Sequence, residues 1–263
     1  MITSKNVLRT ILTFRWNPGL DVLAVIVSWI LVTGTLYIAT VIVTAQAGGG
    51  LPYFFLYGVL GATFFGVGIP LVWMVMIRKR PVRDLGITSK YLGISIVLQL
   101  IFAALQYVGT LARTELPAFE QFLPLVALAL AIGFFEALFW RGWVLLRLEE
   151  AFGVIPAILI GALLYALYHI GYAMPLEEIA FLFWIGVLYA VCFRLTRNIF
   201  ILWPLLQPMG QLVTLVRDGL SLPVLASAGF FEVLIVMLLL VWFLHRFYRK
   251  HHPVQKREAI LTA

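Results

Sequence analysis

Several polar side chains that are costly to place in lipid lie inside the apolar runs of this chain. They are Glu136, His169, Gln207, Gln211 and Glu232. Ionisable residues within membrane segments are rare, and they commonly mark a functional site. A carboxylate and an imidazole that are held together can share a proton or activate a water molecule. These residue types therefore indicate a polar site for acid–base chemistry inside an apolar protein.

The spacing of the first two residues predicts that they lie at the same depth. A turn near residues 151–154 joins the two runs that hold them, and Glu136 precedes Phe152 by 16 residues while His169 follows Gly153 by 16. Because a helix rises about 1.5 Å per residue, both side chains climb the same distance from the turn. We expect Glu136 and His169 to face one another on neighbouring helices.

The two glutamines are four residues apart, so they share one face of a helix. Gln207 follows Arg197 by ten residues, which gives it a depth near that of Glu136. Three helices would then meet at one polar pocket. Each residue also has a purely structural explanation, because glutamines often hold helices together and a lone histidine is often only hydrogen-bonded. Glu232 could likewise be the partner of a nearby polar group.

The composition requires a membrane for most of the chain. Of 263 residues, 63% are hydrophobic and 12% are charged, whereas soluble domains are about half apolar and a quarter charged. The net charge of +7 does not indicate nucleic acid, because the basic residues lie at the ends of the apolar runs. The lone Cys192 excludes an internal disulfide and a cysteine metal cluster. We expect one integral membrane domain over 1–263, surrounded by membrane lipids.

The apolar runs predict an all-α bundle of about eight transmembrane spans. The runs are Val22–Ala45, Leu51–Ile77, Tyr91–Ala112, Phe122–Trp140, Val154–Met174, Ile179–Phe193, Ile199–Val216 and Leu222–Leu244. All Lys and Arg residues except Arg113 and Arg217 then fall on one side, which the positive-inside rule assigns to the cytoplasm. We expect a protein of the cell membrane with both termini cytoplasmic.

The charged ends of the spans carry further expectations. Residues 1–20 form either a basic tail or an interfacial helix that lies on the membrane, and 246–263 form a basic cytoplasmic tail. The fourth helix is expected to continue past Trp140 to Glu150. Arg141 and Arg147 on this extension would reach the lipid headgroups as membrane-edge anchors.

Three motifs in this order resemble the CPBP intramembrane proteases, which include CAAX prenyl endopeptidases and bacteriocin-processing or immunity proteins. They are "EALFWRG", "LLYALYH" and "LWPLLQPMGQ", within a core of residues 122–216. The family pattern is Glu-Glu-x-x-x-Arg, then Phe-x-x-x-His, then His-x-x-x-Asn. "RDLGI" after the second span also resembles the segment that commonly precedes this core.

The resemblance implies roles by position. Glu136, Arg141 and His169 match the first glutamate, the arginine and the first histidine, and Tyr165 takes the aromatic position. In contrast, Ala137 stands where the family has a second glutamate, and Gln207 and Gln211 replace its last histidine and its asparagine.

These departures matter differently under two mechanisms. A zinc site would lose much of its ligand set, because a glutamine amide is a poor zinc ligand; we therefore expect no metal and no cofactor. In a metal-free reaction Glu136 and His169 would activate water, and the amides of Gln207 and Gln211 would donate hydrogen bonds to the oxyanion.

Two functions remain open from the sequence. The chain is either a catalytically weakened or silent scaffold that binds a membrane-protein partner, or an active metal-independent endopeptidase that cleaves a membrane-associated peptide. The changed motif positions favour the scaffold slightly. A transporter is the least favoured function, because internal repeats and paired broken helices are lacking.

Overall fold

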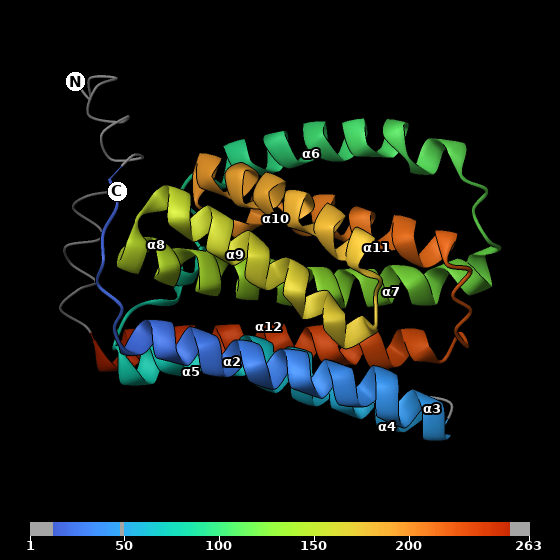
Figure 1. The fold of residues 1–263 in the computed structure, drawn as a ribbon, viewed down its shortest axis with the longest axis horizontal. Helices are drawn as coiled ribbons and strands as arrows, with labels where there is room; N and C mark the ends of the chain where they lie inside the picture. Colours follow the sequence, from blue (N-terminus) through green and yellow to red (C-terminus); the bar gives the residue numbers. More distant parts are fainter. Residues whose placement is uncertain (1–12, 48–49, 253–263) are drawn as a thin grey trace.

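The computed structural model of this protein describes residues 13–47 and 50–252, and these residues form an elongated bundle of helices without a β-strand (Figure 1). Within these described ranges, seven helices are long and apolar enough to cross a membrane. They are Leu20–Val43, Gly50–Ile77, Leu92–Arg113, Phe119–Phe152, Val154–Tyr172, Leu176–Thr196 and Ala226–His251. The polytopic helical bundle expected from the sequence is thus confirmed.

Several of these helices combine α, π and 3-10 segments. In chain order the elements are α2 (Leu20–Tyr37), η1 (Ile38–Val43), α3 (Thr44–Ala47), α4 (Gly50–Phe54), η2 (Phe55–Gly68), α5 (Ile69–Val72), η3 (Trp73–Ile77), η4 (Val82–Leu85), α6 (Leu92–Gly109), η5 (Leu111–Arg113), α7 (Phe119–Glu136), η6 (Ala137–Leu145), α8 (Leu146–Phe152), α9 (Val154–Tyr168), η7 (His169–Tyr172), α10 (Leu176–Thr196), η8 (Ile199–Ile201), α11 (Leu206–Arg217) and α12 (Ala226–His251).

The expected seventh span, Ile199–Val216, is not one helix. It consists of the short η8, a turn over residues 202–205 that contains Pro204, and the 12-residue helix α11. Proline cannot continue a helix that runs into it, and 12 residues rise only about 18 Å, well short of a hydrocarbon core of about 30 Å. The span count is therefore corrected to seven continuous helices and one broken segment.

The longest helix, formed by α7, η6 and α8, lies at the centre of the bundle. Both α11 and α12 pack against α7, and α9 packs against α8 and η6 as well as against α10. Trp140 and Trp143 of η6 are fully buried. The continuation of this helix past Trp140 agrees with the sequence expectation. Gly153, with φ 91°, separates α8 from α9 and makes the expected turn.

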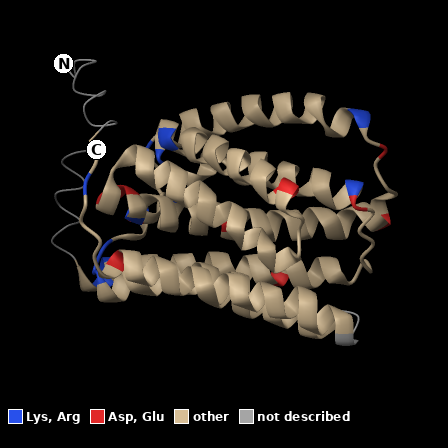
Figure 2. Ribbon diagram, viewed as in Figure 1, with Lys and Arg blue, Asp and Glu red and all other residues tan. Residues whose placement is uncertain are grey.

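Charged residues gather at the ends of the bundle (Figure 2). The start of α2 and the end of α12 lie at the same end, where most of the blue ribbon is found (Figures 1 and 2). Helix α12 includes residues 246–251, so the expected tail begins later; residues 253–263 lie outside the described part of the chain. The same holds for residues 1–12 of the expected N-terminal tail or interfacial helix. Residues 13–19 are not helical, and Arg15 and Asn17 donate backbone hydrogen bonds to the end of α8.

Candidate functional site

The centre of the candidate site is the carboxylate of Glu136, the last residue of α7. Its side chain is fully buried. Its Oε2 accepts hydrogen bonds from Nε2 of Gln207 at 2.7 Å and from Nε2 of Gln211 at 3.0 Å. The other oxygen, Oε1, has no hydrogen-bond partner among the described residues. The structure thus brings together three of the four residues that the sequence singled out for catalysis.

Close contact between α7 and α11 makes these hydrogen bonds possible. Gly133 lies one turn before Glu136, and a Cβ at this position would be 2.6 Å from Cγ of Pro208. Only a residue without a side chain lets Pro208 approach so closely. The spacing of four then directs Gln207 and Gln211 toward the same carboxylate.

The ring of His169 makes no described hydrogen bond to that carboxylate. It is nearly buried at the junction of α9 and η7, and its Nδ1 lies 2.9 Å from the carbonyl oxygen of Tyr165. The rings of Tyr165 and Tyr168 pack against the imidazole with centroids 4.9 and 5.0 Å away. Among the described hydrogen bonds, those of Glu136 go to the glutamines and none goes to His169. The expectation that Glu136 and His169 face one another at the same depth therefore stays a prediction.

The prediction for Arg141 as a membrane-edge anchor is wrong. This side chain is 1% exposed and points into the bundle, where its guanidinium lies 5.1 Å from the ring centre of Tyr165 and 5.9 Å from that of Tyr189. Its Nε and one terminal nitrogen have no hydrogen-bond partner in the described chain. Glu136 interacts with Arg141 electrostatically. Arg147 is likewise buried and donates to Glu150, so it is not a side chain extended into the surrounding lipid. The residues that follow Arg141, including Trp143, Val144 and Leu145, are buried, so this part of the helix lies inside the bundle and not at its lipid-facing surface.

Tyr165, which takes the aromatic position of the second motif, is 2% exposed and contacts both His169 and Arg141. A neighbouring cluster of hydroxyl groups was not foreseen from the sequence. The hydroxyl of Tyr57 is hydrogen-bonded to those of Tyr168 and Tyr172, which also bond to one another at 3.2 Å. These tyrosines fill the space beside the imidazole, because aromatic residues on η2, α9 and η7 face each other there.

A large cavity opens beside this site. Its volume is about 1450 Å³, and most of its lining is apolar. His169, Gln207 and Gln211 line the cavity, whereas Glu136 does not and is hydrogen-bonded to the two glutamines behind the wall. Glu232 on α12 also lines the cavity and is exposed, and no described contact joins it to the other candidate residues. The supporting role expected for Glu232 stays a prediction.

The donor set does not fit a catalytic metal. Among the described residues, no group of three His, Cys, Asp or Glu side chains could hold a metal ion. Zinc favours imidazole, thiolate and carboxylate ligands, and here Oε2 of Glu136 already accepts two amide hydrogen bonds. A mechanism through a bound metal therefore has no support from the chemistry of these side chains.

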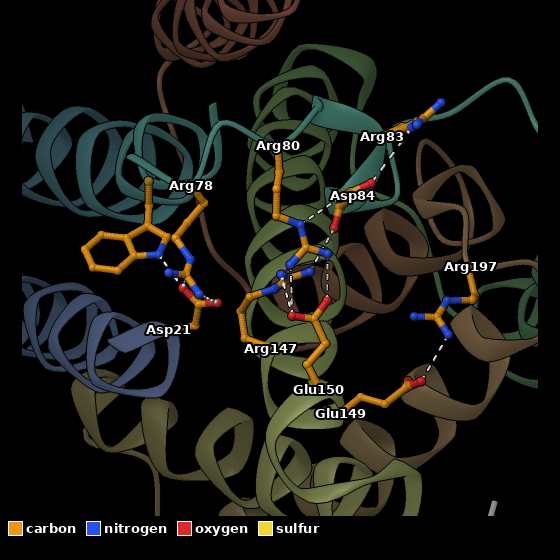
Figure 3. Close-up of polar contacts among 10 residues, drawn as sticks. Asp21, Arg78, Arg80, Arg83, Asp84, Arg147, Glu149, Glu150 and Arg197 are labelled. Carbon is orange, nitrogen blue, oxygen red and sulfur yellow. Dashed lines mark hydrogen bonds and ion pairs between the residues drawn. The ribbon is translucent and has the colours of Figure 1, made fainter. Parts of the chain in front are cut away.

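A second polar region, shown in Figure 3, lies between residues 80–84 and helix α8. Arg80 donates to both carboxylate oxygens of Glu150 at 2.9 and 3.0 Å and to Asp84 at 2.9 Å. The hydrogen bonds to Glu150 raise the pKa of Arg80 above its ordinary value. Arg147 also donates to Glu150, at 2.8 Å. The sequence placed these basic residues on one side but gave no sign of this network.

Hydrogen bonds from Asn198 and Ile199 hold the "RDLGI" segment and the residues after it against the start of η8. The buried side chain of Asn198 donates to the carbonyl oxygens of Thr88 and Lys90 at 2.8 and 3.0 Å, and the backbone N–H of Ile199 donates to Gly86 at 3.0 Å. The start of η8 and the loop before α6 are thereby held together. A single asparagine within "TRNIF" gave no signal of this role.

Comparison with known protein families agrees with the motifs. Residues 118–205, a third of the chain, match the family model described as type II CAAX prenyl endopeptidase Rce1-like. The matched segment includes Glu136, Arg141, Tyr165 and His169, and it ends before Gln207 and Gln211. The resemblance to the CAAX-protease family is thus confirmed. Neither a curated protein nor a solved structure matches the chain.

Proposed function

We propose that this chain, with its core of the CAAX-protease type, is an intramembrane binding protein whose proteolytic site is weakened or silent. Its ligand would be a membrane-associated peptide or the membrane segment of a partner protein. The cavity of about 1450 Å³ would receive the apolar part of that ligand. A peptide that carries a prenyl group is one such ligand, since the matching family model is that of a CAAX prenyl endopeptidase.

The hydrogen bonding of Glu136 carries this proposal. A general base must reach the proton that it abstracts. Here Oε2 is used by two amides, and the imidazole of His169 is bonded to its own helix instead of to the carboxylate. Gln207 and Gln211 therefore act as links between α7 and α11, which stabilise the wall of the cavity.

The alternative is a metal-independent endopeptidase, and one observation favours it. Oε1 of Glu136 has no hydrogen-bond partner in the described chain, so it could accept the proton of an attacking water. The water oxygen would add to the peptide carbonyl carbon. Each glutamine amide has a second N–H that could donate to the resulting oxyanion.

For the orientation we propose that both chain ends face the cytoplasm and that the protein lies in the cell membrane. The start of α2 and the end of α12 lie at one end of the bundle, with most of the basic residues (Figures 1 and 2). The positive-inside rule assigns such an end to the cytoplasm.

A photoreactive farnesylated peptide tests binding and cleavage in the same vesicles. A benzophenone amino acid at Leu188, which lines the cavity, should crosslink to the peptide. The same amino acid at Val97, which is exposed on α6 but does not line the cavity, is the matched control. Equal crosslinking at the two positions would contradict binding in the cavity. Release of the C-terminal tripeptide that stops with Glu136→Gln would support the endopeptidase instead.

A further inference from the structure

A separate pocket lies at the charged end of the bundle, away from the large cavity. Its volume is about 290 Å³, and it is formed by the loop before α6, the start of α8 and the end of α10. Five cationic side chains line it, and only two carboxylates do. The cations are Arg80, Arg83, Lys90, Arg147 and Arg197, and the carboxylates are Asp84 and Glu150. The wall therefore carries a formal excess of three positive charges.

The two carboxylates are already used within the wall. Glu150 accepts from Arg80 and from Arg147, and Asp84 accepts from Arg80 at 2.9 Å (Figure 3). Arg83 reaches Asp84 only at 4.0 Å, and its side chain is 58% exposed. These pairs fix the inner arginines in place and leave positive charge at the pocket.

Two donors in the pocket wall lack a partner among the described residues. They are Nε of Arg147 and the hydroxyl of Thr196, on residues that are 2% and 6% exposed. Buried polar groups are nearly always hydrogen-bonded, and a buried donor without a partner is unfavourable. Both groups can donate to an anion, and arginine matches the geometry of phosphate oxygens.

Arg197 is paired with Glu149, outside the pocket lining, at 3.0 Å. The last of the five cations, Lys90, lies beside Tyr91 in the pocket wall. The ammonium group is 5.1 Å from the centre of the Tyr91 ring, which is more than half exposed. Helix α6 begins at the next residue and is the span with the smallest buried share. A tyrosine and a lysine at the end of a lipid-facing helix are typical of the membrane interface. The pocket therefore opens at the depth of the headgroups.

We propose that this pocket binds the phosphate of an anionic lipid headgroup. Basic pockets between transmembrane helices are known to bind anionic headgroups. The phosphate oxygens would accept hydrogen bonds from the hydroxyl of Thr196 and from Arg147, and Arg83 and Lys90 would close the site from outside. The bound lipid would link the loop before α6 to α8 and α10.

Native mass spectrometry of the full chain, released from mixed micelles, measures this binding directly. The probes are phosphatidylglycerol, phosphatidylcholine as the zwitterionic control, and inorganic phosphate as the soluble anion. We expect phosphatidylglycerol to be retained at least about tenfold more than phosphatidylcholine, because hydrogen bonds to charged groups are the stronger ones. Equal retention of the two lipids would overturn the proposal. Phosphate that displaces the lipid at equal concentration would overturn the assignment to a headgroup.

Variants localise the effect to the pocket. The double variant Arg83→Gln/Lys90→Gln should lower phosphatidylglycerol retention about tenfold, and Thr196→Val a few-fold, since valine keeps the shape and removes the hydroxyl. Thr196→Val should not destabilise the fold, because its hydroxyl has no partner in the described chain. The matched control Arg246→Gln/Lys250→Gln removes two exposed charges from the end of α12, outside the pocket. Equal losses in the two double variants would show a general charge effect and contradict the site.

Discussion

The hydrogen bond between Gln207 and Glu136 should make a measurable contribution to the stability of the bundle. Its length is 2.7 Å, and both side chains are buried, at 1% and 0% exposure. Hydrogen bonds to charged groups contribute about 1.5–3 kcal/mol, and leaving the carboxylate with one donor fewer adds to the loss. We expect Gln207→Leu, which keeps a similar side-chain volume, to lower the free energy of unfolding by about 2 kcal/mol.

A double-mutant cycle isolates this interaction from the packing change. When Glu136→Leu removes the carboxylate as well, both partners are apolar, and Gln207→Leu should then cost little. The expected coupling energy is about 1.5 kcal/mol or more. Gln99→Leu is the matched control: Gln99 is also buried, but its amide nitrogen has no hydrogen-bond partner among the described residues, so this change should be neutral or slightly stabilising.

Reversible unfolding in mixed micelles, followed by tryptophan fluorescence or circular dichroism, gives the four free energies. A cost below about 0.5 kcal/mol for Gln207→Leu, or a coupling energy within about 0.5 kcal/mol of zero, would refute a stabilising role for the amide. The observation that carries the proposed function would then lose its energetic basis.

The close approach of α11 and the direction of the bundle give two further predictions. Gly133→Ala should destabilise the fold by about 1–3 kcal/mol, because its Cβ would lie 2.6 Å from Cγ of Pro208. Gly34→Ala is the control: a Cβ there meets nothing within 4 Å, so this change should be neutral or stabilising in the same unfolding assay. In a background without the native cysteine, Lys90→Cys should label from the cytoplasmic side and Asp218→Cys from the opposite side; labelling of both from one side would contradict the arrangement of the broken segment between them.

Much of the fold could be predicted because a bilayer imposes simple rules. The length of an apolar run predicts a spanning helix, and positions four residues apart share a face. Those rules predicted that Gln207 and Gln211 share a pocket with Glu136, and both amides are hydrogen-bonded to its carboxylate. They did not predict the break before α11, because the run from residue 199 to 216 is mostly apolar and its length suits a spanning helix.

Side-chain partners were harder to predict than positions. Arg141 was expected at the lipid headgroups, since a charge that ends an apolar run usually reaches the interface. Its guanidinium instead lies over tyrosine rings on α9 and α10, which are distant in sequence. Matched depth predicts that His169 faces Glu136, but depth does not determine which hydrogen bonds the ring makes. Its Nδ1 is bonded to the carbonyl oxygen of Tyr165, which leaves Nε2 as the ring nitrogen that can face another group.

Release of a C-terminal tripeptide from a farnesylated peptide, measured by mass spectrometry after reconstitution of the purified chain in vesicles, tests the central claim most directly. The comparison is between the natural chain, Glu136→Gln, and Gln207→His/Gln211→Asn, which restores two of the family's residues. We expect the natural chain to release no more tripeptide than Glu136→Gln, while still binding the peptide. Release by the natural chain that is lost in Glu136→Gln, by about 10²-fold or more, would contradict a silent site.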